Sequence, residues 1–214
     1  MNLNVWQQLK GELISFGKRV GSHGFTAGFD FIQGIPSEII TTFPNRWLEE
    51  YQANSYILHD PVVIWGSQYE GIRNWDELVS LYPTVGGPDV IAAARAQGMA
   101  NGSVLSISVN RSRAIIGITH EETSLPEVER LELFGLLAKM CIECDKRNAG
   151  PELSDLGRRY LQLVSEGLTD KEIAERQGVS QRAVSALRER VMAKLSAPTL
   201  ATALLSAYKY RIID

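Results

Sequence analysis

The chain has 214 residues, of which 22 are Lys or Arg, 25 are Asp or Glu and 3 are His, so its formal net charge is −3. This length is enough for two ordinary domains. No apolar run approaches the ~18 residues of a membrane-spanning helix, and the amino terminus lacks the basic-then-apolar pattern of a secretion signal. We therefore expect a cytoplasmic protein without membrane contact.

Metal and redox chemistry find little support in the composition. Cys141 and Cys144 are the only cysteines, and the only histidines are His23, His59 and His120. A structural zinc site usually takes four ligands, and a disulfide is unfavourable in a reducing compartment. We expect both thiols to behave as small buried hydrophobes, and we predict neither a metal nor a cofactor.

Apolar periodicity predicts alternating helices and strands in the first two thirds of the chain. Leu3, Trp6, Leu9 and Leu13 mark an amphipathic opening helix, and residues 25–32 alternate like a half-buried strand. Further helices are expected at about 45–56, 61–69, 75–81, 88–97 and 126–146, with strands at 103–109 and 114–119 around a hairpin turn at 110–112. Helices on both faces of a central antiparallel sheet would make this an α+β domain, an α/β/α sandwich.

A polar segment with Gly and Pro, residues 145–151, separates two strongly helical patterns and predicts a linker at about 146–152. We therefore divide the chain into two domains, 1–148 and 149–214. Before Gly150 the chain carries 12 Lys/Arg and 17 Asp/Glu, and from Gly150 onward 10 and 8, so the net charge divides into −5 and +2. A weakly basic tail on an acidic body fits nucleic-acid contact by the tail alone.

The tail contains two helical patterns around a glycine, within residues 168–195. Thr169 opens a capping box, Gly178 suits the left-handed end of the first helix, and Val179 is expected to re-enter the core. Ser180 can cap the second helix. This arrangement is typical of a helix-turn-helix, which makes the chain a candidate DNA-binding protein.

In the second of these helices Val184, Leu187 and Val191 fall on one apolar stripe, which leaves a polar face for a major groove. Gln and Arg side chains suit this task because they form bidentate contacts with base edges. The candidate DNA-contacting residues are Thr169, Lys171, Ser180, Gln181, Arg182, Ser185, Arg188 and Lys194. The alternative is an ordinary helical hairpin with a solvated basic face.

The tail resembles the four-helix DNA-binding domain of the LuxR/GerE family. The resemblance rests on the run 153–167 and on Thr169, Glu172, Ile173, Ala174, Val179, Ser180, Val184, Lys194 and Leu195. Family members usually carry an acidic residue, threonine and histidine where this chain has Gly157, Ala183 and Leu187. Gly157 removes half of a capping box and costs up to ~1 kcal/mol, so we expect a less stable domain than in the relatives.

An aromatic and acidic constellation in the first domain extends the resemblance to LuxR-type quorum-sensing receptors. It consists of Phe43, Trp47, Tyr51, Tyr56, Asp60, Val62 and Trp75. The resemblance implies an N-acyl-homoserine lactone, with its lactone carbonyl on Trp47 and its amide N–H on Asp60. The chemistry suits such an amphiphile, because a charge-assisted bond to a carboxylate is worth roughly 1.5–3 kcal/mol. The structural alternative is an aromatic core in which Asp60 caps a helix.

Phe43 departs from the family, because most such receptors carry a tyrosine there whose hydroxyl reaches the acyl carbonyl. A buried carbonyl left unpaired costs about 1–3 kcal/mol, so affinity for a standard signal would fall without another donor. We expect that donor on the hairpin, from Ser103, Ser106, Ser108 or Thr119, and we include Ser106 and Thr119 among the ligand-binding residues.

Three functions from different classes follow. The favoured one is a homodimeric transcription regulator that binds a palindromic operator and senses a small amphiphile. A ligand-independent regulator or a heterodimerising antagonist with weakened DNA binding is the alternative. A lactone hydrolase finds no nucleophile–base pair in the sequence, so we expect no enzyme. The predicted dimer seams are Leu131, Phe134, Leu137, Ala138 and Cys141 in one helix and Leu200, Ala203, Leu204 and Ala207 in another.

Overall fold

The computed structural model describes residues 3–20, 23–32, 34–83, 87, 89–147 and 150–213. The chain divides into two compact units, Met1–Arg147 and Asn148–Asp214. Each unit encloses its own cluster of buried apolar side chains. Within the described residues no helix is long and apolar enough to cross a membrane.

The amino-terminal unit is built on a five-stranded sheet with the order β2-β1-β5-β4-β3. All neighbouring strands pair antiparallel, as predicted. The strands are β1 (Phe25–Ile32), β2 (Ile35–Thr41), β3 (Gly71–Asn74), β4 (Asn101–Val109) and β5 (Ser112–His120).

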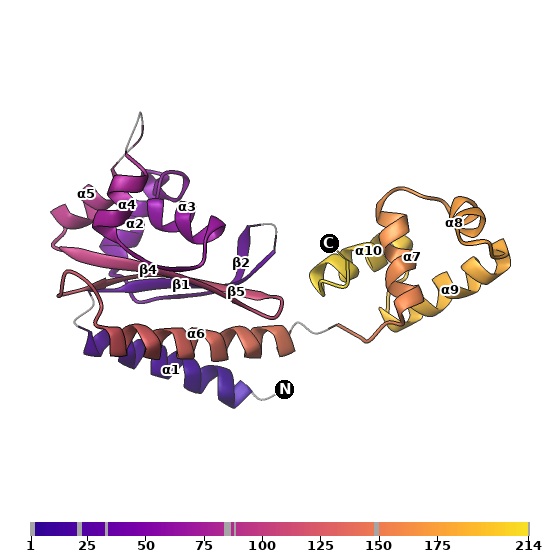
Figure 1. Cartoon of the computed structure of the whole chain (residues 1–214), viewed down its shortest axis with the longest axis horizontal. Helices are drawn as coiled ribbons and strands as arrows, with labels where there is room; N and C mark the ends of the chain where they lie inside the picture. The colour runs from indigo at the N-terminus through magenta and orange to yellow at the C-terminus, as the bar shows by residue number, and fades with distance from the viewer. Residues whose placement is uncertain are drawn as a thin grey trace. The chain divides into compact units, whose positions relative to one another are not determined.

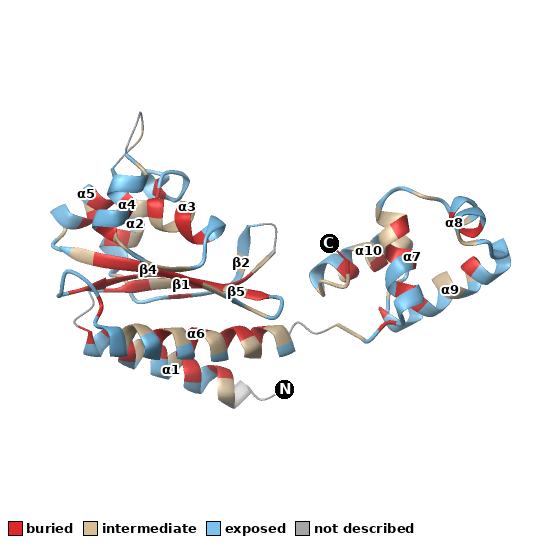
Figure 2. Ribbon diagram, in the orientation of Figure 1, coloured by how far each residue is buried: buried red, intermediate tan, exposed pale blue. Residues whose placement is uncertain are grey.

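Helices cover both faces of this sheet, which confirms the predicted sandwich (Figure 1). On one face lie α1 (Leu3–Arg19) and α6 (Glu127–Arg147), and on the other lie α2 (Asn45–Ala53), the short 3₁₀ helix η1 (Tyr56–Leu58), α3 (Pro61–Gln68), α4 (Trp75–Leu81) and α5 (Val90–Ala96). Buried positions concentrate along the strands and on the inner sides of α1 and α6 (Figure 2). Both cysteines belong to this core.

The alternation of β1 separates the two layers. Ala27 and Phe29 are fully buried in the core under α1 and α6, whereas Gly28 faces the other side of the sheet. Asp30 has φ +56°, a backbone conformation that non-glycine residues rarely adopt. It interrupts the alternation, so that Phe31 turns away from the core and toward the layer of α2–α5.

Two strands and one helix break differ from the sequence prediction. The strand β2 was not predicted, because it lies at the sheet edge, contains Pro36 and leaves Ile35 and Ile39 exposed. The strand β3 has only four residues, too few for a periodic signal. The helix expected at 45–56 ends early, because Ser55 takes φ +51° and starts η1 in a new direction. The predicted start of α5 at Pro88 lies outside the described residues.

The described residues of the carboxyl-terminal unit form four helices, as predicted: α7 (Asp155–Ser165), α8 (Asp170–Gln177), α9 (Gln181–Lys194) and α10 (Leu200–Lys209). Thr169 and Glu172 form the predicted capping box, and Gly178 ends α8 at φ +65°. The expectation for Val179 was wrong. Its amide bonds to the Ala174 carbonyl, and this turn leaves its side chain 45% exposed.

Gly157 has a packing role that its sequence context did not reveal. It is buried in the first turn of α7, where its amide donates to the Ser154 hydroxyl. An added Cβ would lie 3.1 Å from Cγ2 of Val191, which is tight contact. The glycine therefore allows α7 to approach α9 closely, in addition to weakening the helix.

We predict that Gly102→Ala destabilises the protein. A Cβ at Gly102 would lie 2.3 Å from Cε2 of the buried Trp75 indole, so the ring or the strand must shift. Such overpacking costs about 1–3 kcal/mol of unfolding free energy, measurable by urea denaturation. Gly135→Ala in α6 is the matched control, because no atom lies within 4 Å of its added Cβ and helix propensity favours alanine by up to ~1 kcal/mol. Equal stability of the two variants would contradict the packing of Trp75 on β4.

Candidate ligand and DNA sites

A cavity of about 310 Å³ lies between the sheet and the layer of α2–α5. Its walls are mainly apolar and include Val62, Val63, Val90, Ile91 and Ile115. Gly28 of β1 and Gly117 of β5 form part of its floor, and a Cβ at Gly117 would meet Val62 at 2.8 Å. The absence of a side chain at Gly117 therefore lets Val62 of α3 pack directly against β5.

Aromatic rings form one side of the cavity. The distance between ring centroids is 5.9 Å from Trp47 to Tyr51, 5.9 Å from Trp47 to Tyr56 and 6.5 Å from Trp47 to Phe43. Phe43, Trp47, Tyr51 and Trp75 line the cavity. Tyr56 does not line it, contrary to our expectation. It packs behind Trp47 and Tyr51, and its hydroxyl donates to Glu50.

Asp60 combines the two roles that the sequence left open. It is the N-cap of α3, where its Oδ1 accepts from the Val62 amide at 2.8 Å, and it also lines the cavity. Its Oδ2 accepts from the Tyr51 hydroxyl at 2.8 Å. The carboxyl therefore joins α2 to the start of α3 and forms part of the wall of a mainly apolar cavity.

Burial controls the protonation of this pair. Loss of water raises the pKa of Asp60, while hydrogen bonds from Tyr51 and from the Val62 and Val63 amides lower it in part. Burial and the neighbouring Asp60 charge raise the pKa of Tyr51. Tyr51 therefore keeps its proton and remains the donor.

The hairpin hydroxyls do not reach the cavity, which corrects the prediction for Ser106 and Thr119. The Ser106 hydroxyl donates to the Gly66 carbonyl of α3 and accepts from the Arg113 guanidinium, and Ser106 is not among the residues that line the cavity. Thr119 exchanges hydrogen bonds with the Gly24 backbone. Ser103 bonds to His120, and Ser108 is exposed.

Two other hydroxyls, from Thr26 and Thr41, line the cavity instead. They are cross-strand partners on β1 and β2, with their Oγ1 atoms 2.9 Å apart. Neither residue was predicted from the sequence. Strand alternation held a usable signal, because Thr26 must face away from its neighbours Phe25 and Ala27, which are buried in the core.

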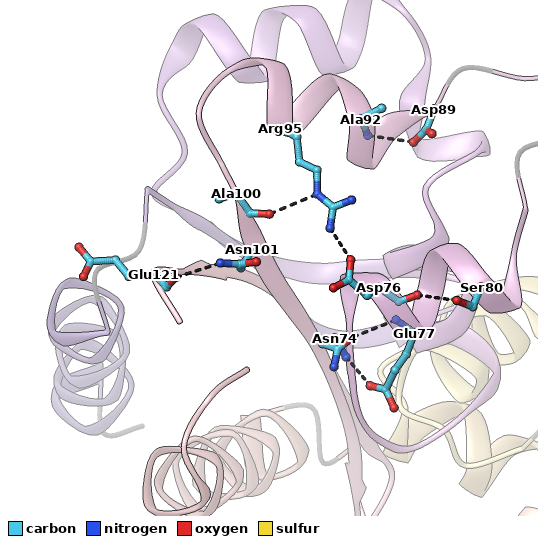
Figure 3. A network of polar contacts seen from close by, with 10 residues as sticks. All are labelled: Asn74, Asp76, Glu77, Ser80, Asp89, Ala92, Arg95, Ala100, Asn101 and Glu121. Atoms are coloured by element: carbon cyan, nitrogen blue, oxygen red, sulfur yellow. Dashed lines mark hydrogen bonds and ion pairs between the residues drawn. The ribbon is translucent and has the colours of Figure 1, made fainter. Parts of the chain in front are cut away.

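A polar network fixes the helices that complete the cavity wall (Figure 3). Asn74 and Glu77 form a capping box at the start of α4, and Asp89 caps α5. Arg95 of α5 binds the Asp76 carboxylate at 2.6 Å and the Ala100 carbonyl at 3.2 Å. The network therefore holds α4 and α5 together where they present Trp75, Val90 and Ile91 to the cavity.

The predicted DNA-contacting residues divide into two groups. Lys171, Gln181 and Arg182 are exposed around the start of α8 and α9. Thr169 and Ser180 cap these helices, so their hydroxyls are engaged with backbone amides. Ser185 is half-buried on α9, and the Lys194 ammonium donates to the Glu152 carbonyl.

Arg188 has an internal partner that the sequence did not reveal. Its guanidinium binds the Asp170 carboxylate at 2.8 Å, and the other oxygen of Asp170 accepts from the buried Tyr160 hydroxyl at 3.0 Å. Burial and the Asp170 bond raise the pKa of Tyr160, so this hydroxyl stays a donor. The chain Tyr160–Asp170–Arg188 ties α7, α8 and α9 together on the side of α9 that we assigned to DNA.

Comparison with known proteins identifies the family. Residues 8–144 match the family model described as autoinducer binding domain, and residues 152–207 match the model described as bacterial regulatory proteins, luxR family. The first match covers more than half of the chain, so the protein belongs to the LuxR family of DNA-binding regulators with an autoinducer-binding domain. This confirms the resemblance found in the sequence.

Individual relatives agree with this family. The quorum-sensing regulator RhlR of Pseudomonas aeruginosa is 24% identical over 189 residues, which cover 80% of this chain and 75% of RhlR. The fold is similar to a crystal structure of Escherichia coli SdiA, with a TM-score of 0.66, 20% identity and coverage of 98% of this chain and 92% of SdiA. A structure of SdiA in complex with octanoyl-rac-glycerol gives a TM-score of 0.65 at 20% identity, with coverage of 98% and 90%.

We predict that Asp60→Asn changes how stability depends on pH. Because burial raises the folded-state pKa of Asp60 above its unfolded value, the carboxyl contributes its full stability below the ordinary Asp range and loses it as the pH rises through the raised value. Asn caps a helix about as well as Asp and does not titrate. The Tm of the variant minus the Tm of the wild type should therefore increase as the pH rises from about 3 to about 8. A constant Tm difference over this range would show that Asp60 is not desolvated.

We predict that alanine substitutions of two arginines of α9 affect different properties, one the stability of the protein and the other its affinity for DNA. Arg188→Ala should lower the unfolding free energy by about 1 kcal/mol, because it leaves the half-buried Asp170 without its cation. Arg182→Ala should change stability by less than about 0.5 kcal/mol, because this side chain is exposed and has no ion pair among the described residues. Arg182→Ala should instead lower DNA affinity by about 1–3 kcal/mol if it reads a base. Urea denaturation and DNA titration measure both, and a variant pair with exchanged effects would contradict this assignment.

Proposed function

We propose that the protein is a cytoplasmic, homodimeric transcription regulator that binds a palindromic DNA site through α9 and senses a neutral acyl amphiphile through its cavity. The observation that carries the proposal is Asp60, a buried carboxylate in the wall of a mainly apolar cavity. A ligand with one N–H or O–H donor and an apolar tail matches this combination. N-acyl-homoserine lactones belong to this class of ligand.

The cavity suits such a molecule in size and chemistry. Its volume lies at the lower end of the usual range for small-molecule sites, roughly 300–1,000 Å³. The Trp47 indole, which lines the cavity, can donate to a carbonyl. The octanoyl-rac-glycerol complex of SdiA supports the same class, since that ligand also combines an acyl chain with a carbonyl and hydroxyl donors.

DNA binding by a pair of chains follows from the size of the helix-turn-helix, which covers too few base pairs to be selective alone. The predicted seams need revision, because Leu137 and Cys141 are buried in one core and Ala203 and Ala207 in the other. Leu131 of the predicted seam is exposed, and the other exposed large apolar side chains on these helices are Val128 of α6 and Leu205 and Tyr208 of α10. They are the residues available for a dimer contact.

A catalytic role has no support in the geometry. Ser103 and His120 form a nucleophile–base pair by residue type, with Oγ and Nε2 2.9 Å apart. Both are buried, at 2% and 4% exposure, and neither lines the cavity. Burial also lowers the pKa of His120. The pair therefore lacks access to a substrate, and we propose binding without turnover.

Weakened DNA binding is the second candidate, and one observation favours it. Arg188 lies on the assigned DNA face but is held by Asp170, and Ala183 and Leu187 add no polar group there. A heterodimerising antagonist would use the same dimer surface without a productive DNA contact. The DNA titration described for Arg182→Ala distinguishes the two functions, because an antagonist shows no salt-dependent DNA complex in the wild type.

We predict that lactone binding responds in opposite directions to two cavity variants. Asp60→Asn should weaken binding by roughly tenfold to a hundredfold, because a neutral amide replaces a charged acceptor. Phe43→Tyr should strengthen it by up to about tenfold, because it adds a hydroxyl donor beside Trp47. A panel of N-acyl-homoserine lactones with different chain lengths, tested by thermal shift on all three proteins, measures this. The absence of stabilisation by every lactone in every protein would rule out this ligand class.

A further inference from the structure

We propose that the hydroxyl pair of Thr26 and Thr41 recognises the acyl carbonyl of the ligand. This inference rests on the proposed function, because it concerns an acyl amphiphile in the same cavity. Such a ligand brings a carbonyl acceptor into a space with few donors, and Phe43 supplies none. A buried carbonyl without a donor loses about 1–3 kcal/mol, so the donor must come from another lining residue.

The described cavity wall offers two kinds of side-chain donor. Indole N–H groups come from Trp47 and Trp75, and hydroxyl groups come from Thr26, Thr41 and Tyr51. The Tyr51 hydroxyl is engaged with Asp60. The two threonines therefore carry the only hydroxyl protons of the described wall that are not held by a charged partner.

The geometry places this pair next to the aromatic wall. Thr41 ends β2 two residues before Phe43, and the Phe43 amide donates to the Thr41 Oγ1 at 3.4 Å. The Thr41 hydroxyl also lies 3.2 Å from the Phe25 carbonyl, to which it can donate. Thr26 is half-buried, and its hydrogen-bond partner among the described residues is Thr41.

The hydroxyl hydrogens of the two threonines can be assigned so that one of them is available to a ligand. When Thr41 donates to the Phe25 carbonyl, Thr26 donates to Thr41. When the Thr26 hydroxyl rotates, the hydrogen bond that it donates to Thr41 is redirected to a ligand carbonyl. Thr41 keeps its hydrogen bonds with the Phe25 carbonyl and the Phe43 amide. The exchange replaces one neutral hydrogen bond with another, so it requires no buried group to lose its partner.

Because the threonine pair recognises a carbonyl oxygen, the protein should select a lipid that has a carbonyl over one that lacks it. The two lipids to compare are the ester 1-octanoylglycerol and the ether 1-O-octylglycerol, which differ in the carbonyl group. The fluorescence of Trp47 and Trp75, which line the cavity, reports binding. We expect the wild type to bind the ester about tenfold more tightly than the ether.

Substitutions of Thr26 distinguish an effect of its hydroxyl group on binding from an effect of side-chain packing. Thr26→Val should bring the ester-to-ether ratio of affinities to about one, and Thr26→Ser, which keeps the hydroxyl, should preserve the ratio. Thr42→Val is the matched control, because the Thr42 hydroxyl accepts from the Phe25 amide and lies outside the cavity lining. Thr26→Val combined with Phe43→Tyr should restore the preference for the ester.

Each outcome decides the inference. An unchanged ratio in Thr26→Val, or an equal loss of both lipids, would overturn it, because the carbonyl would then be recognised elsewhere or Thr26 would only fill space. If the wild type binds neither of the two lipids and none of the lactones, the proposed function itself is overturned. Binding of the lactones with no ester preference would overturn the threonine assignment alone.

Discussion

The carboxylate of Asp60 is the constraint on which the sensor unit depends. One oxygen accepts from the first turn of α3 and the other from Tyr51 of α2, so a single buried group sets the start of one helix and its distance from another. Desolvation opposes its charge, and three hydrogen bonds offset part of that penalty. A ligand N–H or O–H would add a further donor and cover the carboxylate from water. Binding and local stability are therefore coupled at this residue.

Glycines on the sheet let the residues around the cavity pack directly against the strands. Gly117 allows Val62 to approach β5, and Gly102 lets the Trp75 indole rest directly on β4. The opposite face of the same strands carries Ala27, Phe29 and other residues of the core that α1 and α6 complete. One sheet thus provides a close-packed core on one side and a ligand space on the other.

Local signals predicted much of this architecture. The bounds of β1 and α4 agree with the predicted 25–32 and 75–81, because strand alternation and a capping box are encoded by adjacent residues. Features that depend on distant partners could not be predicted. Ser106 appeared available as a hydroxyl, but its partners on α3 and β5 are known only from the fold. Arg188 appeared free for DNA for the same reason, since its partner Asp170 lies on the preceding helix.

We propose that Asp60 receives a hydrogen bond from a bound acyl amphiphile, and a crystal structure of the full chain grown with N-octanoyl-homoserine lactone would show this contact. We expect the lactone in the cavity between the sheet and α2–α5, with its amide nitrogen within about 3.2 Å of an Asp60 oxygen and its acyl chain against Val62 and Ile115. A lactone bound in this cavity with its amide turned away from Asp60, or bound at another place on the protein, would contradict it.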